Sequence, residues 1–185
     1  MMYDVSYWDE YARSNESRYS EEFATTISNM LYDLQCHSVL EVGCGTGIDL
    51  LKINQDVLMC GADLNSQALC MAKRLNPLGN FQRCTVEQLP YADSSIDFVF
   101  SHGLLSCLDD TILVGTMSEM YRVARRYIMD CEMLGDDGEV IDGPFYQRNM
   151  QARWQCHGLQ PIRTQTIPGA AHLVPRTLQL YGLDE

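Results

Sequence analysis

The sequence predicts an α/β protein built on a doubly wound, mostly parallel sheet. Two observations lead to this prediction. Short apolar strands alternate with amphipathic helices from Ser38 to Met133, and the first strand leads into a glycine-rich loop, GCGTG at 43–47. Such alternation is typical of parallel strands joined by crossover helices. With 185 residues, the chain is long enough for one domain with its own core.

The region before the sheet is predicted to be helical. Apolar residues recur at helical spacing between Ser6 and Tyr32, and the polar stretch 14–17 divides the region into two helices. Its aromatic side chains are candidates for a lid over a binding site, although ordinary packing explains such a stripe as well. These aromatic residues are Tyr3, Tyr7, Trp8, Tyr11 and Tyr19.

Five strands are expected in the core of the domain. They lie at 38–42, 57–63, 81–86, 96–101 and 126–133. The connecting helices are expected from the glycine loop to about Ile53, after an N-cap at Asn65 or Ser66, and over 111–124. The fourth strand, IDFVFS, lacks polar alternation, which indicates burial on both faces.

The C-terminal third is expected to add a helix and a hairpin. A turn at Gly143-Pro144 precedes a predicted helix over 145–158, and strand-like runs at 159–167 and 171–183 flank Pro168-Gly169. Pro175 requires the second run to lie at an edge or a bulge. The prediction is a single domain over 1–185 with a seven-stranded sheet and helices on both faces. Its parts are a lid segment at 1–35, a cofactor-binding core at 36–135 and the C-terminal helix and hairpin at 136–185.

Composition narrows the function classes. The formal charge of −12 opposes binding to nucleic acid, which needs a basic face. Arg122, Arg125 and Arg126 form either a local basic patch or a helix end that complements its dipole. No apolar run approaches the roughly 18 residues of a membrane span, and the N-terminus lacks the pattern of a signal peptide. A cytoplasmic protein is therefore expected.

The eight cysteines are expected to be reduced and buried. They are scattered singly, no CxxC pair occurs, and no Cys/His cluster has zinc-ligand spacing. Small hydrophobic thiols in the core explain this distribution. Neither disulfides nor a metal site is predicted.

The glycine loop and the following strand indicate a nucleoside site. Glycines at 43, 45 and 47 let a ligand approach the backbone closely, and the helix after them offers free N–H groups. Asp63 ends the second strand, where a carboxylate accepts hydrogen bonds from ribose hydroxyls. The spacing is GxGxG, and Ile48 stands where the dinucleotide fingerprint needs a third glycine.

The segment EVGCGTG resembles motif I of the class I methyltransferases that use S-adenosylmethionine (SAM), within the group that includes the ubiquinone and menaquinone biosynthesis methyltransferases. Three further segments resemble this family in the correct order: GADLNSQALCMAK, EQLPYADSSIDFVFS and EMYRVARR. The resemblance covers about Ser38 to Met133. It implies a Rossmann-like fold, SAM as the methyl donor and S-adenosylhomocysteine (SAH) as the product.

The resemblance also implies which residues contact the cofactor. They are Glu41, Gly43, Cys44, Gly45, Thr46, Gly47, Asp63, Leu64, Val86, Glu87 and Ser101. Relatives carry a carboxylate for the adenine amino group just after the third strand, where this chain has Thr85 or Val86. Backbone groups, the Thr85 hydroxyl and Glu87 are therefore alternative adenine partners, and solvation is the other explanation for Glu87.

His102 is the candidate catalytic residue. It follows the fourth strand, and imidazole titrates near neutral pH, so it suits a general base if the acceptor must lose a proton. Packing at a strand end explains it equally well. A group of C-terminal residues is expected to border the acceptor pocket: Arg148, Arg153, Trp154, His157 and His172.

The predicted function is methyl transfer from SAM to a small-molecule acceptor. Motifs of amino-methylating DNA enzymes and of cytosine C5 enzymes are absent from the sequence, and no large insertion provides a substrate domain. Two alternatives remain open. One is a SAM-binding protein of this fold without turnover, and the other is a nicotinamide-dependent oxidoreductase.

Overall fold

The computed structural model describes residues 5–13, 19–133, 135, 140–142, 145–167 and 175–183. The fold and the cavity are formed by these residues. Tyr3, His172, the polar stretch 14–17 and the turns at 143–144 and 168–169 lie outside them.

Seven strands form the central sheet, in the order β3-β2-β1-β4-β5-β9-β8. The first five are parallel, β9 pairs antiparallel to β5, and β8 pairs antiparallel to β9, so that β8 and β9 form a C-terminal hairpin. A separate two-stranded pair consists of β6 and β7. The strands are β1 (Ser38–Val42), β2 (Leu58–Asp63), β3 (Asn80–Arg83), β4 (Ile96–His102), β5 (Ala124–Glu132), β6 (Val140–Asp142), β7 (Phe145–Tyr146), β8 (Pro161–Ile167) and β9 (Arg176–Gly182). The predicted fold class is confirmed.

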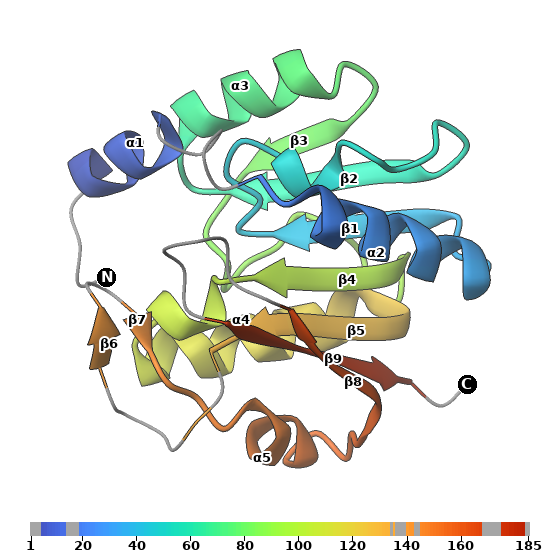
Figure 1. Ribbon diagram of the computed structural model, residues 1–185, viewed down its shortest axis with the longest axis vertical. Helices are drawn as coiled ribbons and strands as arrows, with labels where there is room; N and C mark the ends of the chain where they lie inside the picture. The colour runs from blue at the N-terminus through green and yellow to red at the C-terminus, as the bar shows by residue number, and fades with distance from the viewer. Residues whose placement is uncertain are drawn as a thin grey trace.

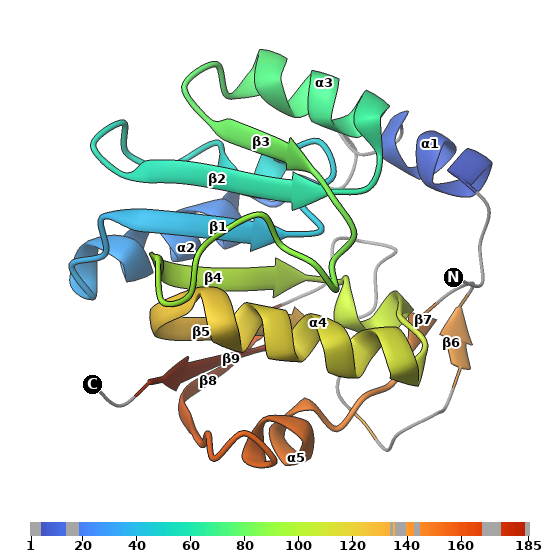
Figure 2. The same cartoon turned by 180° about the vertical axis from the view of Figure 1, so that it is seen from behind.

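Helices cover both faces of this sheet (Figures 1 and 2). The helix α2 packs on one face and α4 on the other, while α1 lies beside α3 near the carboxyl ends of the parallel strands. The helical segments are α1 (Val5–Arg13), α2 (Glu21–Asp33), η2 (Ile48–Leu50), α3 (Ser66–Leu75), η3 (Leu105–Cys107), α4 (Asp110–Val123) and α5 (Met150–Gln155). Here η2 and η3 are short 3₁₀ turns.

The two faces carry separate apolar cores because successive residues of a strand point to opposite sides. Leu40 of β1 joins the core under α4 and α5, whereas Val39 joins the core under α2. Phe98 and Val99 of β4 divide in the same way. Every residue of β1 is buried, as a central strand of a covered parallel sheet requires.

Side-chain caps fix where the helices begin. Ser20 accepts from the N–H of Phe23 at α2, and Asp109 accepts from the N–H of Ile112 at α4. The side chain of Asn65 accepts from two N–H groups at the start of α3, which settles the predicted choice between Asn65 and Ser66. The loops before α3 and α4 follow the carboxyl ends of β2 and β4, and these caps fix where each helix begins.

Three predicted elements are shorter than expected. The helix after the glycine loop is only η2, because Gly47 offers no side-chain cap and the chain turns again at Asn54. The third strand ends at Arg83, where its only partner, β2, also ends. The second hairpin strand begins after Pro175, which has no N–H to donate to a ladder.

The helix predicted over 145–158 is also wrong in extent. Residues 145–146 form β7, which pairs with β6, and α5 covers Met150–Gln155. Asn149 caps α5 by accepting from the N–H of Ala152, so the helix begins later than its apolar pattern suggests.

The three neighbouring arginines serve the fold. Arg122 pairs with Glu119 and Asp93, Arg125 pairs with Asp97, and Arg126 donates to carbonyl groups at the end of α2. Their intramolecular partners favour a structural role over a basic binding patch.

The eight cysteines are free thiols. Cys36, Cys44, Cys60 and Cys131 are buried as predicted, but Cys70 and Cys156 are exposed, so burial is not general. In the described part of the chain, no helix is long and apolar enough to cross a membrane. The cytoplasmic location stays a prediction.

Candidate cofactor and acceptor site

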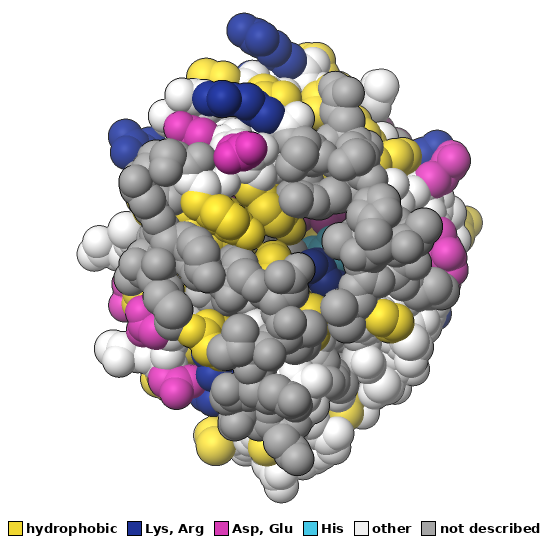
Figure 3. Space-filling view, turned by 60° about the vertical axis from the view of Figure 1, so that its left-hand side comes forward, with side chains coloured by type: hydrophobic (Ala, Val, Ile, Leu, Met, Phe, Trp, Pro, Cys, Tyr) yellow, Lys and Arg dark blue, Asp and Glu magenta, His cyan; other side chains and the backbone are white. Residues whose placement is uncertain are grey.

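A cavity of about 470 Å³ opens at the carboxyl ends of the parallel strands. Its wall is formed by the glycine loop, the ends of β2 and β4, the start of α3, the helix α1 and the beginning of β9. Figure 3 shows this face as a hollow with hydrophobic side chains around a basic side chain and a histidine. Loops that follow parallel strands meet at this edge, where α/β folds bind their ligands.

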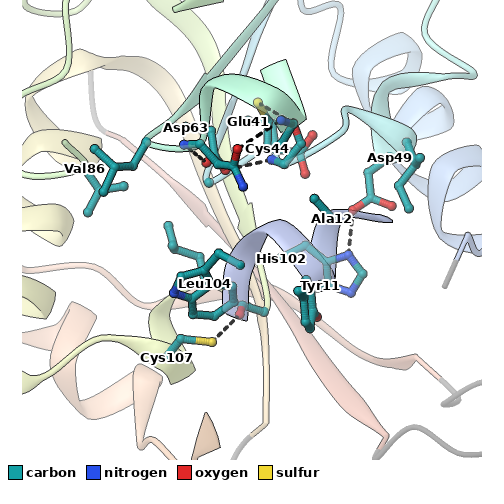
Figure 4. A pocket seen from close by; sticks show the side chains of 18 of the residues that line it. Tyr11, Ala12, Glu41, Cys44, Asp49, Asp63, Val86, His102, Leu104 and Cys107 are labelled. Atoms are coloured by element: carbon teal, nitrogen blue, oxygen red, sulfur yellow. Dashed lines mark hydrogen bonds and ion pairs between the residues drawn. The ribbon is translucent and has the colours of Figure 1, made fainter. Parts of the chain in front are cut away.

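Asp63 holds the glycine loop in place. Its carboxylate accepts hydrogen bonds of 2.8 Å from the N–H of Gly45 and of 2.8 Å from the N–H of Asn65 (Figure 4). Gly45 has a φ of 50°, a left-handed conformation that glycine adopts without strain. Because a carboxylate has about four acceptor positions, Asp63 keeps acceptor capacity toward the cavity that it lines.

Glu41 is a buried carboxylate beside the same loop. It is 3% exposed and lines the cavity, and its Oε2 atom has no hydrogen-bond partner among the described residues. Burial, followed by the negative charges of Asp49 and Asp63, raises the pKa of Glu41 well above its usual value. A buried, unsatisfied acceptor costs free energy unless a ligand donor meets it. This end of the cavity therefore suits a cationic, hydroxyl-rich ligand such as SAM.

His102 pairs with Asp49, a residue that the sequence did not single out. The Nδ1 atom of His102 lies 2.7 Å from Oδ2 of Asp49, and the ring centroid lies 4.0 Å from that of Phe23 in α2 (Figure 4). Both members of the pair line the cavity and are largely shielded from solvent. If Nδ1–H donates to Asp49, the Nε2 atom is left as the basic nitrogen.

The helix α1 closes one side of the cavity. Trp8 and Tyr11 lie in the wall and pack edge to face, with ring centroids 5.4 Å apart. Asp9 ties α1 to the start of α3 by accepting from the Asn65 side-chain amide at 2.9 Å. Tyr7 packs on Trp8 outside the wall, and Tyr19 does not line the cavity. A lid role for Trp8 and Tyr11 stays a prediction.

The candidate adenine partners lie together. Thr85, Val86 and Glu87 follow β3 and line the cavity next to Leu64 and the start of α3. Thr85, Val86 and Glu87 therefore all remain candidates for the contact with the adenine amino group.

Another part of the cavity wall is mainly apolar, and the sequence did not predict it. Its wall contains Leu104, Cys107, Leu108, Ile112, Ile167 and Arg176. Glu132 at the end of β5 shapes this wall: its buried carboxylate accepts from the N–H groups of Leu104 and Leu105 at 3.1 and 2.9 Å. It also accepts from the N–H and the hydroxyl of Ser106.

Three residues expected to contact the cofactor are not on the cavity wall. Thr46 is buried behind the loop, and the carbonyl of Gly47 accepts from the Asn76 side chain. Ser101 is fully buried within β4, and its hydroxyl has no partner among the described residues. The remaining predicted residues, Glu41, Gly43, Cys44, Gly45, Asp63, Leu64, Val86, Glu87 and His102, all line the cavity.

The C-terminal residues expected at the acceptor pocket support the fold instead. Trp154 is fully buried and donates to Asp130 at 2.8 Å, and His157 packs against Trp154. Arg148 and Arg153 both pair with Asp110 at the start of α4. None of these four lines the cavity, so this expectation was wrong for them.

Comparison with known proteins assigns the class. Residues 39–126 match the family described as methyltransferase domain. This match covers just under half of the chain, and the sheet order and the glycine loop agree with a methyltransferase domain in that region. The resemblance found in the sequence is confirmed.

Two curated relatives match this region. Malonyl-(acyl-carrier protein) O-methyltransferase of Pectobacterium atrosepticum is 30% identical over 112 residues, which cover 58% of this chain and 44% of that protein. Phosphatidylethanolamine N-methyltransferase of Cereibacter sphaeroides is 31% identical over 94 residues, which cover 48% and 45%. The chain thus spans less than half the length of these relatives.

Solved structures share the fold across the chain. Magnesium protoporphyrin IX methyltransferase from Synechocystis PCC 6803, with bound SAM, superposes with a TM-score of 0.69 at 14% identity over 100% of this chain and 86% of that one. The 1,6-didemethyltoxoflavin-N1-methyltransferase of Burkholderia thailandensis, with bound 1,6-didemethyltoxoflavin and SAH, gives 0.73 at 14% identity over 100% and 92%.

Proposed function

We propose that this chain transfers a methyl group from SAM to a small-molecule acceptor. The observation that carries the proposal is one continuous cavity. Asp63 and the glycine loop suit the cofactor, and the His102–Asp49 pair and an apolar wall line the same cavity. A volume of about 470 Å³ falls in the range of small-molecule pockets. The curated relatives named above are likewise methyltransferases.

In this proposal, each residue has a defined task. SAM supplies a methyl group on a sulfonium, whose electron pair returns to sulfur when the acceptor attacks in line. Asp63 holds the ribose hydroxyls, and Glu41 accepts from the cofactor beside the glycine loop. Alignment of donor and acceptor in the closed cavity supplies much of the catalysis. His102 removes the acceptor proton through Nε2, while Asp49 orients its ring through Nδ1.

The first test is calorimetric titration of the purified protein with SAM, SAH and NADH. Binding of SAM and SAH at micromolar levels without binding of NADH supports the proposal and excludes the oxidoreductase. Formation of SAH with a panel of small metabolites then separates an enzyme from a SAM-binding protein without turnover. A folded protein that binds neither SAM nor SAH would refute the proposal.

Asp63→Ala is expected to weaken SAH binding. Losing a charge-assisted acceptor costs roughly 1.5–3 kcal/mol, which corresponds to roughly tenfold to a hundredfold in Kd. The variant also releases the N–H of Gly45, so the loop loses its anchor. Calorimetry measures the change, with Asp56→Ala, an exposed residue before β2, as the matched control. Equal affinity in the two variants would remove Asp63 from the site.

Binding of SAM is expected to strengthen with rising pH and to release protons. Burial and the nearby carboxylates raise the pKa of Glu41 in the free protein, and a bound cation lowers it again. Between these two pKa values, binding expels a proton, so affinity rises with pH by up to about tenfold per pH unit for one proton. Calorimetry in buffers of different ionisation enthalpy counts the protons released.

Glu41→Gln is the control for this linkage. Its side chain keeps its size and cannot titrate, so the number of protons released should fall. Proton release that is identical in the variant and in the wild type would assign the linkage to another group.

A further inference from the structure

Arg176 places a positive charge at the acceptor end of the cavity. It is the first residue of β9, which runs antiparallel to β5 and so begins at the carboxyl edge of the parallel strands. Its side chain lines the cavity. A ligand that binds this charge would occupy the cavity described above, so the inference rests on the proposed function.

The guanidinium of Arg176 lies directly against Gly103, the residue after His102. A Cβ atom added at Gly103 would lie 2.6 Å from the guanidinium carbon, so a side chain there would displace the guanidinium. Gly103 also has a φ of 64°, which glycine adopts without strain. The guanidinium thus lies beside the residue that follows the candidate base, and the ring of Phe145 lies 6.0 Å from the guanidinium carbon.

No hydrogen bond or ion pair satisfies this guanidinium within the part of the chain that the structure describes. Other arginines on the cavity or in the core have acceptors: Arg83 donates to the carbonyl of Leu64, and Arg148 pairs with Asp110. A guanidinium has five donors in a planar fork and suits a carboxylate or a phosphate. Apolar side chains around the guanidinium lower the local dielectric constant, which strengthens a hydrogen-bonded ion pair with such a ligand.

Three carboxylates of the cavity have other partners among the described residues. Asp63 accepts from the backbone, Asp49 pairs with His102, and Asp9 accepts from the Asn65 side chain. None of these three is hydrogen-bonded to Arg176, so its positive charge stays available to a ligand. Leu104 and Ile112 add apolar area to the wall of the same cavity.

We propose that the acceptor is a small organic acid whose anionic group binds Arg176 and whose apolar body packs against the wall around Leu104. A carboxylate and a phosphate share the chemistry that the guanidinium recognises. His102 lines the same cavity as Arg176 and is therefore available to take the proton of the group to be methylated.

The test uses the protein saturated with SAH and pairs of probes that differ in charge. These pairs are benzoate with benzamide, phenylacetate with phenylacetamide, and phenyl phosphate with phenol, followed by ligand-observed NMR. At least one acid should bind roughly tenfold tighter than its neutral partner, as expected for one charge-assisted bidentate pair. Arg176→Gln should abolish the difference. Arg163→Gln, an exposed arginine on β8 outside the cavity wall, makes the same charge change and should retain it.

Three results would overturn this inference. The wild type could fail to prefer the acids, or Arg176→Gln could keep the preference. Arg176→Gln could also weaken binding of SAH and leave binding of 5′-methylthioadenosine unchanged, which would assign the guanidinium to the cofactor's own carboxylate. Absence of SAH binding in the wild type would remove the proposed function and this inference together, whereas SAH binding without acid preference removes the inference alone.

Discussion

A His102→Asn variant is expected to transfer methyl groups roughly 10²- to 10⁴-fold more slowly than the wild type, which is the usual contribution of a general base. Its affinity for SAH should stay close to that of the wild type, because the proposed task of the ring is to take the acceptor's proton and not to hold the cofactor. The asparagine keeps polarity and approximate size but has no basic nitrogen. Turnover with an acceptor found in the metabolite panel measures the effect.

The pH dependence of the rate separates chemistry from packing. A wild-type rate that requires a general base should vary with pH, and His102→Asn should lack this variation. Asp49→Asn keeps the imidazole but loses the carboxylate 2.7 Å from Nδ1, so the rate should fall less and the variation should persist. Because Asp49 acts through His102, it is a positioning residue.

His157→Asn provides the matched control for this experiment. His157 packs against Tyr121 and Trp154 away from the cavity, so its replacement should leave the pH profile unchanged. Should His102→Asn show the wild-type rate and profile, His102 would be a ring packed on Phe23, and the acceptor would need no base.

The cofactor end could be predicted from the sequence because its residues are neighbours along the chain or at the ends of successive strands. The glycine loop directly follows β1, and Asp63 ends β2, so the parallel pairing of the two strands brings them together. Asn65 was recognisable as a cap from its position before a helical pattern. Local spacing and one rule of sheet topology were enough for these residues.

The acceptor end could not be predicted in this way because its contacts join distant segments. Asp49 and His102 are separated by 53 positions, and no spacing rule connects them. Arg176 follows a proline in a strand that pairs at the far side of β5. The prediction for the C-terminal residues failed for a related reason. Tryptophan and arginine are common in binding sites, but Trp154 donates to the buried Asp130 and Arg148 pairs with Asp110 at the start of α4, so both stabilise the fold.

Glu132→Ala is expected to lower the free energy of unfolding by about 3 kcal/mol or more, since each buried donor left without an acceptor costs about 1–3 kcal/mol. The carboxylate accepts from three successive N–H groups, those of Leu104, Leu105 and Ser106, and from the Ser106 hydroxyl. Alanine provides no acceptor for any of them. Urea denaturation measures the loss.

Two further variants show whether the loss comes from the hydrogen bonds. Glu132→Gln keeps one acceptor oxygen but directs an amide donor at the N–H or the hydroxyl that lost its partner, so its loss should be smaller than that of alanine. Glu10→Ala, on the exposed side of α1, should change stability by no more than about 0.5 kcal/mol. If Glu132→Ala were as stable as this control, water would be accepting hydrogen bonds from the N–H groups that Glu132 accepts from in the wild type. The wall around Leu104 would then owe its shape to packing against Gly43 rather than to the buried carboxylate.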